Sequence, residues 1–163
     1  MLLFTELVVV APDGPHPDAE SFWPSVWAGE EFDSDGDFYY DGIDGRWTML
    51  ELRTKVAGAA DSVLEVYTFR ERRNYDPGLD DVARLERTLD DVKAGRWADD
   101  ATISAMTEVA VTSLTVRTTS TDHYREYLES VAMFLDHSGG VTVGRLVLDA
   151  AGFRRTFLDA AAS

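Results

Sequence analysis

The sequence predicts an α+β fold, in which an antiparallel or mixed sheet of about five strands carries two long helices and a short C-terminal helix. β-branched, apolar segments separated by turn residues recur along the chain, and two longer segments have apolar residues at helical spacing. The early strands follow one another without a crossover helix, which excludes a fully parallel sheet. We therefore expect a single domain over residues 1–163, with the helices on one face of the sheet.

The N-terminal half supplies the first three expected strands. The near-continuous apolar segment 2–10 indicates a buried strand that ends at a turn rich in proline and glycine. Residues 21–27 are expected to form a short helix capped by Ser21. Segments 47–56 and 62–70 alternate apolar and polar residues, so they are expected to pair as antiparallel strands joined through Gly58.

The C-terminal half alternates helices and strands. Asp76 and Pro77 are a typical helix start, and the apolar stripe that follows ends before Gly95. A Val/Thr-rich strand is expected over 106–117, and a helix over 122–137 that stops at the glycine pair 139–140. A last strand over 141–148 and a short helix carrying Phe153 and Phe157 complete the prediction.

Composition places the chain among ordinary globular proteins, because 45% of its 163 residues are hydrophobic and 28% are charged. The absence of cysteine excludes disulfides, thiolate metal sites and a cysteine nucleophile, and it is consistent with the cytoplasm, where we expect the protein. No signal peptide or membrane-spanning segment is recognised in the sequence. The formal net charge of −15 argues against binding to nucleic acid or to anionic membranes.

Most of this negative charge lies near the N-terminus. Residues 1–45 contain eleven acidic residues and no lysine or arginine, whereas residues 46–163 contain nineteen acidic and fifteen basic residues. The acidity is therefore local, and it is concentrated in a loop-rich segment at 11–46 whose Asp-Gly pairs favour tight turns.

No catalytic motif is found. The chain lacks the glycine-rich phosphate loops and the GxSxG elbow, so no catalytic residue is predicted. His123 and His137 lie almost four helical turns apart, roughly 21 Å, and cannot share a metal ion. We interpret His16 as a loop residue and the pair His123 and Glu126 as a solvated surface pair. Arg70 heads an arginine cluster interpreted as a solvated strand end, with anion binding or pairing with the acidic loop as alternatives.

One stretch resembles the start of a calcium loop. Carboxylates at alternate positions followed by Gly36 follow the first half of an EF-hand loop, but the bidentate glutamate expected at position twelve is replaced by Gly42. A divalent-metal site for Ca²⁺ or Mg²⁺ is a weak alternative, and no cofactor is predicted. The candidate ligands are Glu31, Asp33, Asp35 and Asp37.

The same stretch has the character of a recognition surface, because carboxylates that attract a basic partner alternate with aromatic anchors. A solvated loop whose aromatic side chains turn inward is the alternative interpretation. The candidate partner-binding residues are Glu30, Glu31, Asp33, Asp35, Asp37, Phe38, Tyr39, Tyr40, Asp41 and Asp44.

Three functions follow from these observations. The first is a cytoplasmic acidic protein-binding domain, such as an inhibitor or immunity-type protein, that engages a basic protein through its acidic N-terminal third. The second is a small enzyme or ligand binder that uses a metal or carboxylate site in the acidic loop. The third is a subunit of a larger assembly, including a homo-oligomer.

Overall fold

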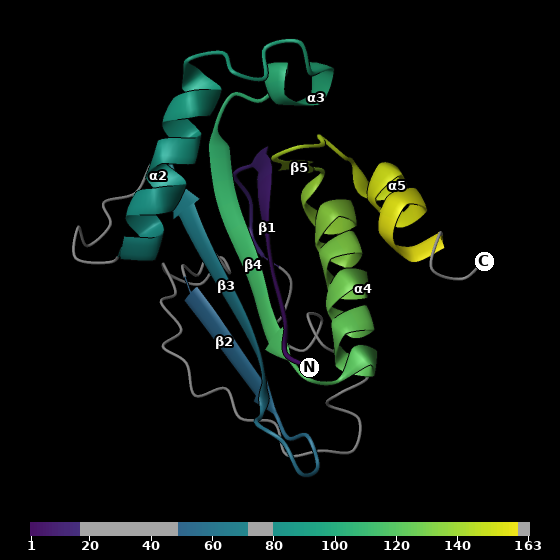
Figure 1. Ribbon diagram of the computed structural model, residues 1–163. Helices are drawn as coiled ribbons and strands as arrows, with labels where there is room; N and C mark the ends of the chain where they lie inside the picture. Colours follow the sequence, from purple (N-terminus) through teal and green to yellow (C-terminus); the bar gives the residue numbers. More distant parts are fainter. Residues whose placement is uncertain (17–48, 72–79, 160–163) are drawn as a thin grey trace.

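The computed structural model describes residues 1–16, 49–71 and 80–159, and it has an α+β architecture built on one antiparallel sheet (Figure 1). This confirms the predicted fold class. In chain order the elements are β1 (Leu3–Pro12), β2 (Met49–Thr54), β3 (Ser62–Arg70), α2 (Asp80–Lys93), α3 (Ala101–Ser104), β4 (Val109–Thr118), α4 (Thr121–Ser138), β5 (Val141–Val143), α5 (Ala150–Phe153) and the π-helical turn η2 (Arg154–Asp159).

The sheet has the strand order β2-β3-β4-β1-β5, and every neighbouring pair is antiparallel. The first strand of the chain therefore lies inside the sheet, between two strands from the C-terminal half. β4 and β5 run in the same direction on either side of β1, and α4 makes the crossover that connects them. The long pairing of β1 with β4 runs without interruption from Leu3 opposite Thr118 to Pro12 opposite Val109.

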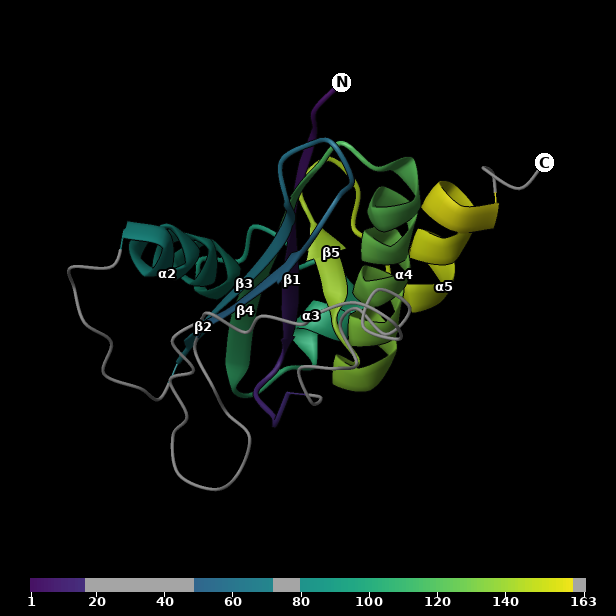
Figure 2. The same cartoon turned by 90° about the horizontal axis from the view of Figure 1, so that it is seen from below.

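Helices cover both faces of the sheet, so the expectation that they share one face is wrong. One core cluster contains Leu85 and Leu89 of α2 together with Val10 and Val111 of the strands. The second cluster packs α4 and α5 against the opposite face of the sheet. It contains Val9, the residue directly before Val10. Figure 2 shows α2 on one side of the strands and α4 with α5 on the other. The reason is that adjacent residues of a strand point to opposite faces, and both faces of β1 are apolar.

The helix α4 matches its prediction closely. Ser120 caps its N-terminus by accepting a hydrogen bond from the backbone N–H of His123, and Gly139 ends it in the left-handed conformation at φ 70°. Gly140 is required for another reason. A Cβ atom at this position would lie 2.6 Å from the backbone oxygen of Val10, so the double glycine both ends the helix and lets the chain approach β1 closely.

Other boundaries differ from the prediction. β5 contains only three residues of the segment expected to be a strand, because the chain turns at Gly144 (φ 141°) and returns to form an isolated bridge between Thr142 and Leu148. The short helix α3 was not expected. The start predicted for the helix that contains α2 and the helix predicted at 21–27 lie outside the described residues.

The described helices are too short or too polar to span a membrane.

Candidate functional site

All ten predicted partner-binding residues, and the four metal candidates among them, belong to residues 17–48, which lie outside the described part of the chain. Their roles therefore stay predictions. The described residues that flank this segment are His16 and Met49. They lie at the same end of the sheet, since Met49 pairs with Tyr67 near the end of β3 and His16 follows the end of β1. At this end the described side chains form a polar cluster.

The centre of this cluster is Arg70, whose side chain is 0% exposed. Its guanidinium forms an ion pair with the carboxylate of Asp13, whose side chain is 8% exposed, and donates a hydrogen bond of 2.9 Å to the carbonyl oxygen of Gly14. The interpretation of Arg70 as a solvated strand end is therefore wrong. Burial of a full positive charge is tolerated here because a carboxylate and a carbonyl from the acidic N-terminal segment face it.

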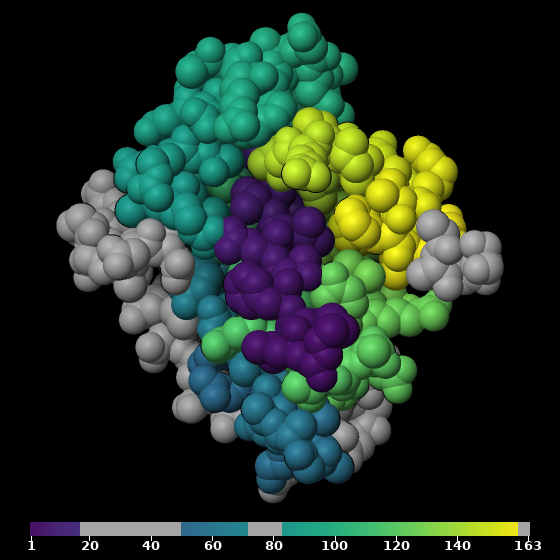
Figure 3. Space-filling view, in the orientation of Figure 1, coloured from purple at the N-terminus to yellow at the C-terminus, as the bar shows by residue number. Residues whose placement is uncertain are grey.

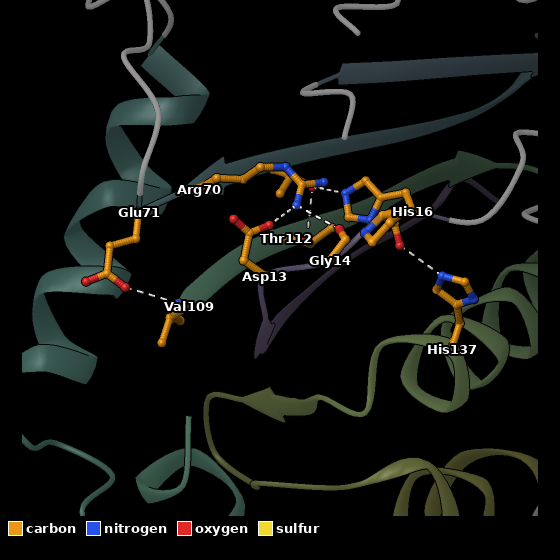
Figure 4. Close-up of polar contacts among 10 residues, drawn as sticks. Asp13, Gly14, His16, Arg70, Glu71, Val109, Thr112 and His137 are labelled. Carbon is orange, nitrogen blue, oxygen red and sulfur yellow. Dashed lines mark hydrogen bonds and ion pairs between the residues drawn. The ribbon is translucent and has the colours of Figure 1, made fainter. Parts of the chain in front are cut away.

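A second part of the cluster is a row of hydroxyl groups that ends at His16 (Figure 4). Thr68 and Thr112 are opposite each other on β3 and β4, and their hydroxyl oxygens are 2.9 Å apart. The Nε2 atom of His16 lies 2.8 Å from the Thr68 hydroxyl, and its ring packs on Phe134 of α4 with 5.4 Å between ring centroids. His16 is therefore half-buried and held between the sheet and α4, and its interpretation as a simple loop residue is wrong.

The surroundings of His16 favour its neutral form. Burial lowers the pKa of His16 well below 6.5, and the positive charge of Arg70 and the nearby His137 lower it further. At neutral pH the imidazole is uncharged, so the Arg70–Asp13 ion pair provides the formal charges at the centre of the cluster. The neutral ring can form its hydrogen bond to Thr68 without adding a second positive charge beside the guanidinium.

A cavity of about 210 Å³ lies beside these residues. His137, at the end of α4, donates a hydrogen bond of 2.9 Å from Nε2 to the carbonyl oxygen of Pro15 and so forms part of its wall. The remaining lining is mixed and consists of Ala11, Pro12, Asp13, Gly14, His16, Ala110, Thr112, Phe134 and Ser138. This volume is smaller than that of most ligand pockets and is comparable to one large side chain.

Chemically, these contacts are suited to anchoring and not to catalysis. The Thr68 and Thr112 hydroxyls belong to residues that are at most 1% exposed, so they are not accessible as nucleophiles. The Asp13 carboxylate is held by Arg70. Among the described residues, no three histidine or acidic side chains are close enough to hold a metal ion. The cluster binds the chain between Asp13 and His16 to the sheet, directly before the acidic segment continues.

A second histidine was also misinterpreted. The Nδ1 atom of His123 lies 2.7 Å from the hydroxyl of Ser62, which is fully buried and lies 2.6 Å from the Thr118 hydroxyl. The expected solvated pair with Glu126 is therefore wrong for His123. The signal available in the sequence was the presence of Ser62, Thr68 and Thr112 within apolar strands, because buried hydroxyls require hydrogen-bond partners.

Comparisons of the chain with protein families, with curated proteins and with solved structures found no match.

Proposed function

We propose that this protein is an acidic protein-binding domain that works as an inhibitor or immunity-type protein and engages a basic protein partner through its N-terminal third. The observation that carries the proposal is the distribution of charge, with eleven acidic residues and no base in residues 1–45. A concentrated negative field attracts a basic surface over a distance and raises its association rate, and interleaved aromatic residues supply contact energy.

The described residues support this proposal through their basic side chains. At least eight of the twelve lysines and arginines in the described ranges form ion pairs within the chain. Arg70 pairs with Asp13 and Arg84 pairs with Glu6, whereas the other six bases pair with carboxylates outside residues 1–45 and leave the remaining acids of that part uncompensated by these pairs. Residues 17–48 contain nine acids and one arginine, so about half of the net charge of −15 lies in about a fifth of the chain.

The attachment of the segment gives a second line of support. Both described flanks, His16 and Met49, are fixed to the same end of the sheet, and the Arg70–Asp13 ion pair and the His16–Thr68 hydrogen bond reinforce the first of them. A recognition segment held at both ends loses less conformational entropy on binding than one held at a single end.

The decisive experiment measures binding to the protein encoded beside this one, by calorimetry at low and at high salt. We expect nanomolar affinity that weakens as the salt concentration rises, because salt screens attraction between exposed charges. The triple variant D33N/D35N/D37N removes three negative charges and is expected to weaken binding by about tenfold or more, through slower association.

A charge-matched control uses three exposed acids of the described surface. The variant E86Q/D90N/D99N changes the net charge equally, but at α2 and the turn after it. If affinity depends on the acidic segment, this control retains most of its binding. An affinity that does not change with salt concentration, or that falls equally in both triple variants, would contradict the proposed site.

A further inference from the structure

The first strand of the chain has an open edge. On one side, β1 pairs with β4 along all ten of its residues. On the other side, β5 pairs only with Val8, Val9 and Val10. On this second side, the stretch Leu3–Leu7 therefore has no strand beside it among the described residues. A strand edge of this kind is a template for pairing with another chain.

The register shows which backbone groups point to this edge. The backbone N–H of Asp13 donates to the carbonyl oxygen of Glu108, which continues the β1–β4 ladder by one position. Because successive residues of an antiparallel strand direct their N–H and C=O groups to opposite sides, the odd-numbered residues of β1 face β4. Phe4 and Glu6 therefore direct their backbone groups to the open edge.

Exposed apolar side chains lie at both ends of this edge. Leu2 is 63% exposed and Phe4 is 59% exposed at its N-terminal end. At the other end, β5 stops at Val143 opposite Val8, and the turn that follows carries Leu146, which is 56% exposed. In Figure 3 β1 is open to view between the α2 and α3 side and the α4 and α5 side, below β5.

The charged side chains beside this edge, which discourage strand pairing in many proteins, are paired within the chain. Glu6 forms an ion pair with Arg84 of α2. Arg117, which lies opposite Phe4 on β4, is 3.7 Å from the carboxylate of Glu65. Both side-chain charges are thus compensated within the chain, and the stretch Leu3–Leu7 carries no charged side chain besides Glu6.

We propose that the open edge of β1 pairs antiparallel with the same edge of a second copy of this chain. Centred on Thr5, this arrangement places Phe4 opposite Glu6 of the second copy and forms two pairs of backbone hydrogen bonds. It also brings Leu2 of each copy to the point where β5 of the other copy ends at Val143, beside the turn that carries Leu146.

The distribution of apolar side chains favours a second copy over a different protein. A two-fold axis brings the N-terminal end of one edge to the β5 end of the other, so the exposed residues of the two ends meet twice. In the part of the edge that the structure describes, the carboxylate of Glu6 is paired with Arg84, so it does not select a basic strand of another protein. Because the paired stretch is short, the dimer is expected to be weak, with a dissociation constant in the micromolar range or higher.

Sedimentation velocity over a concentration series of the full chain tests the pairing. We expect reversible dimerisation that strengthens when NaCl rises from about 50 to about 500 mM, because salt screens the repulsion between two acidic copies. The variant F4P removes an outward N–H but no β1–β4 hydrogen bond, and it is expected to weaken dimerisation at least tenfold. F157A, which truncates an exposed apolar residue of η2, is the matched control and is expected to change nothing.

Amide hydrogen exchange of the wild-type chain gives a readout that does not depend on any variant. The amides of Phe4 and Glu6 are expected to exchange more slowly as protein concentration rises, whereas those of Val8 and Val10, already beside β5, are expected not to change. A chain that remains monomeric at about 1 mM in high salt overturns the proposal, as does a dimer that F4P leaves intact. Unchanged exchange at Phe4 and Glu6 in a dimer would place the contact elsewhere and also overturn it.

Discussion

The two ends of the sheet face that α4 covers are built alike but differ in charge. At each end, a hydroxyl on β3 bonds to a hydroxyl on β4, and a histidine bonds to the β3 hydroxyl: Ser62 with His123 at one end, and Thr68 with His16 at the other. The first histidine belongs to α4, at the beginning of that helix. The second lies directly before residues 17–48, beside the buried guanidinium of Arg70.

This difference separates a purely structural contact from one connected to the acidic segment. The Ser62 end ties the start of α4 to the sheet through neutral hydrogen bonds. The Thr68 end ties down the chain that leads into residues 17–48, and it does so through an ion pair as well as hydrogen bonds. We therefore expect the two ends to respond very differently to mutation and to pH.

The largest effect is expected from R70A. Removing the guanidinium leaves the Asp13 carboxylate buried without its opposite charge, which costs about 3–5 kcal/mol of unfolding free energy. Urea denaturation monitored by circular dichroism measures this loss. R125A removes an exposed ion pair with Glu129 on α4 and is expected to cost less than about 1 kcal/mol. Equal losses in the two variants would contradict the role given to the buried pair.

A smaller effect is expected from H123A at the neutral end. The variant removes the hydrogen bond of the histidine to Ser62, while Ser62 keeps its bond to Thr118, so the cost should be about 1 kcal/mol. The same denaturation experiment measures it, and binding to the basic partner is expected to be unchanged. A loss of partner binding in folded H123A would remove the distinction between the two ends.

The third prediction concerns pH at the charged end. Because folding lowers the pKa of His16 below 6.5, the unfolded chain takes up a proton first as the pH falls. The contribution of His16 is fully present above about pH 6.5 and is lost toward the folded pKa, with a slope of at most about 1.4 kcal/mol per pH unit. The variant H16Q keeps a hydrogen-bonding side chain but cannot titrate. Denaturation midpoints between pH 7.5 and pH 5.5 are expected to fall less in H16Q than in the wild type. If the midpoints of H16Q and the wild type fall in parallel as the pH is lowered, His16 is not the titrating group.

The sequence was a good guide to elements whose signals are local. The alternation within β3 and the helical spacing and caps of α4 lie within one continuous stretch, so both elements were predicted to within a residue or two. The side of the sheet on which each helix packs was not predicted correctly, although the unbroken apolar run of β1 carried the signal, since a strand buried on both faces needs cover on both.

The candidate site was much less predictable. Arg70 finds its carboxylate 57 residues away, at Asp13, and His16 finds its hydroxyl 52 residues away, at Thr68. Such pairings depend on the strand order of the sheet, and no spacing rule within a single stretch reveals them. An arginine among polar residues at a strand end is usually solvated. Arg70 is buried because the chain that follows β1 brings Asp13 and Gly14 to it.

The central position of β1 has a consequence for the order of folding. Its partner β4 begins about a hundred residues later in the chain, so at typical synthesis rates β1 waits about 5–20 s for the strand that covers one of its edges. Until then the segment 3–10 remains an apolar strand without its neighbours. The slow step in the biogenesis of this protein is thus expected to be the closing of a long-range pair, and the nascent chain is most vulnerable to aggregation before it.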